Sequence, residues 1–145
     1  MLVALAAGPA VGGGDLSPDE ARVRVTHHLQ QADALARQFE RVVGDECPRF
    51  ATRAEWNGYV DDTVDRVILL AAHIEQAWVE AKRTGDDEVR REAKMPRKRL
   101  DQARLLVEKL QGCADNHGTG LPTAALMRRI ERDVPLRQAE IALPQ

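Results

Sequence analysis

The chain has 145 residues, of which 43% are hydrophobic, 30% are charged and only 3% are aromatic. This length is enough for one domain with a hydrophobic core, and the composition fits neither a disordered chain nor a membrane-embedded one. An all-β fold would need more aromatic and β-branched residues, so the composition favours helices. The formal net charge of −2 gives no general signature of a nucleic-acid binder.

Charge is unevenly distributed along the chain. Residues 1–81 carry a net charge of −6, whereas residues 82–145 carry +4. Acidic and basic helices that pack side by side would explain this asymmetry. The alternative is a basic face that meets an anionic partner.

The N-terminal residues 1–15 are small and apolar, with no charge before Asp15. They match the end of a secretory signal peptide, including an A-x-A pattern at Ala4–Ala6, although the basic start is missing. We therefore expect Met1 to be an internal start, or a boundary, within an export signal, followed by one domain over residues 16–145. The alternative is an apolar tail of no consequence. The run is too short to span a bilayer.

Two long helices are expected first. Ser17, Pro18 and Glu20 form a capping-box start, and an apolar seam spaced by alternating threes and fours predicts a helix over 18–43. A second capping box at Thr52 and Glu55 begins a helix over 53–83 with the same spacing. Gly44 and the Thr84–Asp86 stretch supply the two stops.

A third helix is predicted over 87–111, kinked at Pro96 because an internal proline removes one backbone hydrogen bond. A glycine-rich loop over 112–122 leads to a shorter fourth helix from about residue 123, which Pro135 kinks or ends. Short links between such helices favour an all-α, antiparallel up-down bundle of three long helices plus a shorter fourth.

The chain contains two cysteines, Cys47 and Cys113. In an up-down bundle the loops that carry them lie at the same end, so the sequence predicts a disulfide between them. Disulfides persist in oxidising compartments, which agrees with export. The alternatives are two unrelated cytosolic thiols, or a reactive thiol at Cys113 beside His117.

Two histidines border apolar seams, His28 in the first helix and His73 in the second. We interpret them as ordinary boundary residues and expect no cofactor. Either one could instead be an axial haem ligand, for example opposite Met95, and the 113–119 loop gathers further oxygen and nitrogen atoms. No covalent haem, zinc-protease or di-iron motif supports these alternatives.

A basic run contains Lys94, Arg97, Lys98 and Arg99. It is a candidate anion-binding patch for phosphate, an acidic protein or anionic lipid, although neighbouring acids and the absence of aromatics favour a solvated helix face. Asp61 and Asp65 lie one turn apart on the second helix, where the ordinary interpretation is a pair of solvated acids near a helix N-terminus.

The sequence therefore indicates a non-enzymatic protein of the periplasm or the cell exterior that acts as an interaction or structural module. Its expected partner is a protein of unknown identity, with neither nucleic-acid binding nor a membrane span favoured. Two alternatives remain open: a haem- or metal-binding bundle, and a cytosolic module that binds an anionic partner through residues 82–104.

Overall fold

The structure is a computed structural model that describes residues 15–94, 100–116 and 118–144. These residues are helical apart from their loops and include no strand, so the predicted all-α class is confirmed. None of the described helices is long and apolar enough to cross a membrane. The helices are α1 (Pro18–Gly44), α2 (Arg53–Ala81), α3 (Asp87–Lys94), α4 (Leu100–Asn116) and α5 (Thr123–Ile141).

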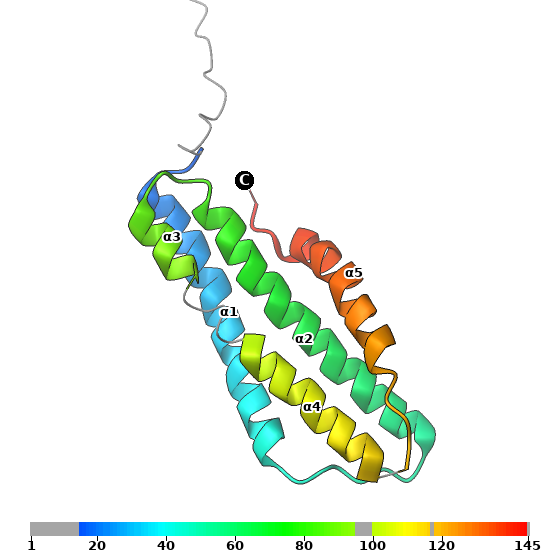
Figure 1. The fold of residues 1–145 in the computed structure, drawn as a ribbon. Helices are drawn as coiled ribbons and strands as arrows, with labels where there is room; N and C mark the ends of the chain where they lie inside the picture. The colour runs from blue at the N-terminus through cyan, green and yellow to red at the C-terminus, as the bar shows by residue number, and fades with distance from the viewer. Residues whose placement is uncertain (1–14, 95–99, 117, 145) are drawn as a thin grey trace, which may run out of the picture.

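The helices α1 and α2 pack side by side, and α5 packs on α2 (Figure 1). Both predicted capping boxes are present, with Ser17 and Glu20 at the start of α1 and Thr52 and Glu55 at the start of α2. In each box the side-chain oxygen accepts a hydrogen bond from a free backbone N–H of the first turn. Local sequence therefore determines where the two longest helices begin.

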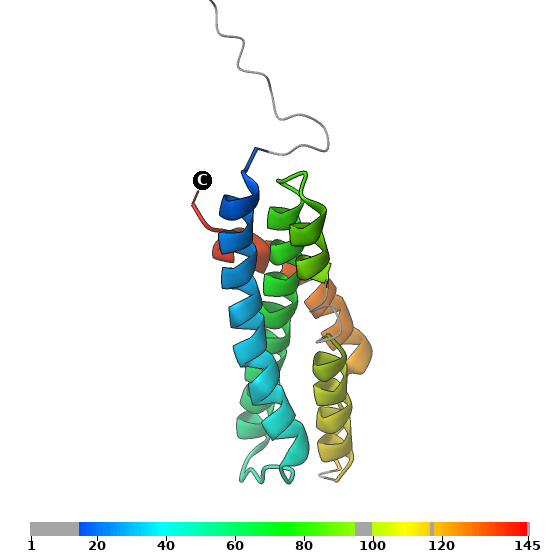
Figure 2. The same cartoon turned by 90° about the vertical axis from the view of Figure 1, so that its left-hand side faces the viewer.

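The predicted third helix corresponds to two described helices, α3 and α4, so the chain has at least five helices where four were expected. The predicted kink at Pro96 lies outside the described residues. Figure 2 shows α3 and α4 one after the other along the same side of the molecule, next to α1 and α2.

The end of α4 lies beyond the predicted stop at Gly112, because the helix continues to Asn116. Cys113 and Ala114 are buried in this extra turn, and their burial outweighs the cost of about 1 kcal/mol for a glycine inside a helix. The chain instead turns at Gly118, whose φ is +67°. The N–H of Gly118 bonds the carbonyl of Asp115 there.

Pro135 does not end α5, which continues to Ile141. Figures 1 and 2 show that this helix changes direction towards its C-terminal end, as expected for an internal proline. After the helix, the backbone carbonyls of Leu143 and Pro144 accept hydrogen bonds from Arg24 on α1. The C-terminal segment is thereby attached to the first half of α1.

The core consists of three apolar clusters along the molecule. The cluster nearest the N-terminus joins α1, α2 and α3, the middle cluster joins α1, α2 and α4, and the last joins α2, α4 and α5. Their buried members are Ala21, Val25, Ala77, Ala81, Val89 and Ala93; Ala32, Phe39, Val67, Leu70, Ile74, Ala103 and Leu106; and Trp56, Val60, Val64, Ile68, Cys113, Ala114 and Leu126.

Candidate functional site

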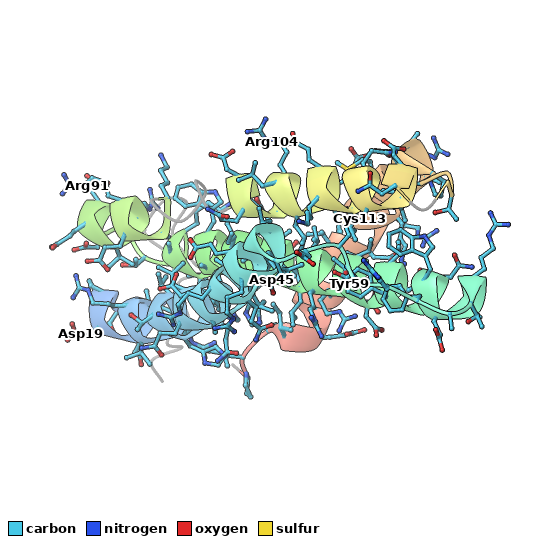
Figure 3. The ribbon with its side chains drawn as sticks, turned by 90° about the horizontal axis from the view of Figure 1, so that it is seen from below. Asp19, Asp45, Tyr59, Arg91, Arg104 and Cys113 are labelled. Carbon is cyan, nitrogen blue, oxygen red and sulfur yellow. A yellow bond between two sulfur atoms is a disulfide. The ribbon has the colours of Figure 1, made fainter. Side chains whose placement is uncertain are left out.

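The predicted disulfide is present between Cys47 and Cys113, whose Cα atoms lie 5.5 Å apart. Cys47 belongs to the loop between α1 and α2, and Cys113 lies in the last turns of α4 rather than in a loop. Figure 3 shows Cys113 and Tyr59 towards one end of the molecule, with Asp19 and Arg91 at the other. The disulfide therefore defines one end, which we call the stapled end.

A cavity of about 310 Å³ opens at the stapled end, between the α1–α2 loop and the loop that follows α4. Its walls come from the first turn of α2 and from the turn at Gly118. The lining residues are Phe50, Ala51, Thr52, Arg53, Trp56, Gly118 and Thr119. Because Cys47 and Cys113 join the two segments covalently, the walls of this cavity are held together.

The cavity borders an aromatic cluster of Phe50, Trp56 and Tyr59. Their ring centroids lie 5.2–6.1 Å apart. Burial raises the pKa of Tyr59, so its hydroxyl stays neutral at physiological pH. The guanidinium-bearing Arg53 is exposed beside these rings. The chain has few aromatic residues, and three of them gather here.

The two histidines named from the sequence meet across the α1–α2 interface. The Nδ1 atoms of His28 and His73 lie 3.0 Å apart, within hydrogen-bond distance. His28 is fully buried and His73 is 6% exposed, so the boundary interpretation is wrong for both. Sequence spacing could place each histidine near a seam, but only the register between the two helices brings them into contact.

Burial lowers the pKa of both imidazoles to about 4 and is the largest cause of each shift. His27 and Arg24 add a repulsive contribution at His28. Both rings are therefore neutral at pH 7, and one Nδ1–H donates to the other Nδ1.

The described residues do not assemble the ligand sets that the haem and metal alternatives would need. Two imidazole nitrogens on one tetrahedral zinc ion would lie about 3.3 Å apart, and two on opposite sides of a haem iron about 4 Å apart. The two Nδ1 atoms are closer than either, at 3.0 Å. Met95 and His117 lie outside the described residues. In the part of the chain that the structure describes, no three His, Cys, Asp or Glu side chains are grouped to hold a metal ion.

A charged network that sequence reasoning missed lies near the histidines on the side away from the stapled end. Glu80 is only 2% exposed, and Arg83 donates to its carboxylate at 3.0 Å. The amide of Gln76 donates to the same group at 3.2 Å, and Arg24 lies 3.7 Å from it. Arg83 also bonds Asp15, which lowers the pKa of that carboxyl. The i,i+3 spacing of Glu80 and Arg83 was the only feature of the sequence that could have indicated an ion pair in this network.

The basic patch is described only at Lys94, because Arg97, Lys98 and Arg99 lie outside the described residues. The Lys94 ammonium lies 5.0 Å from the ring centroid of Trp78.

The ordinary interpretation of Asp61 and Asp65 is a pair of solvated acids, but both carboxylates are engaged by another helix. Arg129 of α5 donates to both carboxylates, at 3.1 and 2.6 Å, and so joins α5 to α2.

A second cavity, of about 300 Å³, lies where α2, α4 and α5 meet. Its lining is apolar except for Arg104 and Glu108 on α4, and Met127 of α5 is 44% exposed beside it.

Comparisons with protein-family models, with curated proteins and with solved structures find no match to this chain.

Proposed function

We propose that this chain is a non-enzymatic, exported module that binds a protein partner in the periplasm or outside the cell. The observation that carries the proposal is the Cys47–Cys113 disulfide. A disulfide between two structural elements is typical of oxidising compartments and rare in the cytosol. The apolar residues 1–15 agree with export. In this proposal the antiparallel bundle expected from the sequence is the scaffold that presents the binding loops.

The stapled end is the proposed partner-binding surface. Its cavity combines an exposed Arg53 with the rings of Phe50 and Trp56, and arginine and aromatic side chains dominate the energy of many protein interfaces. Loops held on a rigid scaffold commonly carry binding functions. Because the disulfide limits the motion of both loops, less conformational entropy is lost when a partner binds.

Site-specific photo-crosslinking tests this surface directly. A photoreactive phenylalanine analogue replaces Arg53 at the stapled end or, as the control, Val23, which is 70% exposed on α1 near the opposite end. In cells of the native host, the Arg53 position should yield one discrete crosslinked protein that the Val23 position does not. Equal crosslinking from both positions, or none from either, would contradict the proposed surface.

Simple assays of the purified protein distinguish the proposed function from the two alternatives that the sequence left open. A haem- or metal-binding bundle predicts visible absorbance or stoichiometric metal in freshly purified protein. An anion-binding module predicts binding that weakens steeply with salt and that depends on residues 82–104. Either result would replace the proposed function.

A further inference from the structure

The His28–His73 pair lies between two of the three core clusters. One turn before His28, Val25 packs in the cluster shared with α3, and one turn after it Ala32 packs in the middle cluster. On α2, Ala77 and Leu70 flank His73 in the same way. The pair is thus a polar contact inside an apolar interface, at the point where the first half of α1 meets the second half of α2.

The contact depends on the number of protons that the pair carries. With both rings neutral, one Nδ1 donates and the other accepts, which fits the 3.0 Å separation. With both rings protonated, each Nδ1 carries a hydrogen, so the hydrogen bond cannot form and two positive charges face each other. A first proton placed on Nε2 of His28 also has a cost, because that atom is buried with no hydrogen-bond partner among the described residues.

Among the described residues, no group acts to stabilise a positive charge on the pair. The groups that act on His28 are Arg24 and His27 on α1, together with His73 itself on α2, and His27 also acts on His73. The nearby carboxylate of Glu80 on α2 is already engaged by Arg83 and Arg24. From the C-terminal segment, the contacts reach Arg24 through backbone carbonyls rather than through a charged side chain.

We propose that the His28–His73 contact is an acid-sensitive latch: protonation separates α1 from α2 in the half of the interface away from the disulfide. The Cys47–Cys113 bond keeps the other end closed. One end of the molecule is therefore fixed covalently, and the other opens and closes with pH. The C-terminal segment is released with the opening, since Arg24 on α1 holds it.

Residue-resolved amide hydrogen exchange of the oxidised protein tests the latch between pH 7.5 and pH 5. After correction for intrinsic exchange, protection of residues 21–32 and 70–80 should fall by on the order of a thousandfold, because opening exposes both imidazoles and takes up two protons. Protection of residues 56–64 and 106–113 should change far less. Unchanged protection of the first two segments, or an equal loss at both ends, would overturn the proposal.

Two variants separate the latch from general acid sensitivity. The double variant His28→Leu/His73→Leu replaces both partners with apolar side chains, so it should keep full protection at pH 5. The control His27→Gln removes a repulsive neighbour but leaves the hydrogen bond of the pair in place, so it should weaken the acid response only in part. An acid response that persists unchanged in the double leucine variant would exclude the two histidines as its cause.

Discussion

Cys47 and Cys113 are 66 residues apart in the sequence, yet their Cα atoms lie 5.5 Å apart and a disulfide joins them. The bond connects the α1–α2 loop to the end of α4, beside an aromatic cluster and a cavity. It also encloses the whole of α2 and α3 within one covalent loop. The stability of the molecule and the shape of its proposed binding surface therefore depend on the same bond.

Removing the disulfide should lower the free energy of unfolding substantially. For a loop of 66 residues, the chain-entropy model gives about 4 kcal/mol. Urea denaturation of a Cys47→Ala/Cys113→Ala variant, followed by circular dichroism, measures this loss. The reduced unaltered protein serves as the control and should match the variant closely. A loss below about 1 kcal/mol would show that the unfolded chain gains little freedom when the bond is absent.

The buried carboxylate of Glu80 makes its cationic partners important for stability. Arg83→Met removes the nearest of them and should cost about 3 kcal/mol, because a charge that is 2% exposed loses its closest partner. The double variant Arg83→Met/Glu80→Gln should recover part of the loss. As the control, Arg104→Met removes an exposed i,i+4 pair with Glu108 and should change stability by about 0.5 kcal/mol or less. Equal losses in the two single variants would contradict this account.

Two neighbouring glycines should respond to alanine in opposite directions. Gly112 lies inside α4, where an added Cβ meets no atom of the described residues within 4 Å, so Gly112→Ala should stabilise the protein by about 0.5–1 kcal/mol. Gly118 has a φ of +67°, and Gly118→Ala should destabilise it by about 1 kcal/mol. Thermal unfolding of both variants measures these shifts. Destabilisation by Gly112→Ala would mean that α4 does not continue through this position.

The helix starts could be predicted from the sequence because capping is local. Ser17 with Glu20, and Thr52 with Glu55, are three residues apart and determine their helix starts without help from the rest of the fold. The end of α4 could not be predicted in this way. Gly112 is a local stop signal, but the burial of Cys113 against α2 and α5 overrides it.

The contact between His28 and His73 depends on the relative rotation and register of two helices. Periodicity places each residue only near its own seam. The same holds for Arg129, which lies 64 residues from Asp65 in the sequence and bonds it directly. The disulfide was predictable because it required only that two segments share an end of the molecule. The cavity beside it follows from the packing of two loops, for which the sequence has no local signal.

Stability should decrease as the pH falls from about 6.5 to about 4. Burial lowers the pKa of His28 and His73 from 6.5 to about 4, so between these values the unfolded chain binds more protons than the folded one. The stabilisation is complete above pH 6.5 and is lost progressively below it, at about 3 kcal/mol for each histidine if the two titrate independently. Urea denaturation at several pH values measures how the free energy of unfolding changes with pH. Equal stability at pH 7.5 and pH 5 would contradict the buried, neutral state of the pair.

Carboxyl groups add to the pH dependence of stability at lower pH. The pKa of Asp15 is lowered chiefly by its hydrogen bond with Arg83, and the pKa of Asp133 chiefly by its hydrogen bond with Arg132. The stabilisation from these two carboxylates is fully present above the pKa that they have in the unfolded chain. It is lost as the pH falls through their lower pKa in the folded protein. A Leu substitution at both His28 and His73 should therefore remove the slope between pH 6.5 and 5 while leaving the loss at lower pH.

The redox state and the compartment of the protein in its native cells test the central proposal most directly. Cells are quenched in acid and fractionated, and free thiols are labelled with a maleimide that adds visible mass. We expect Cys47 and Cys113 to be unlabelled until a reductant is added, in protein recovered from outside the cytoplasm. Protein recovered in the cytoplasmic fraction with both thiols labelled would contradict the exported, disulfide-stapled module.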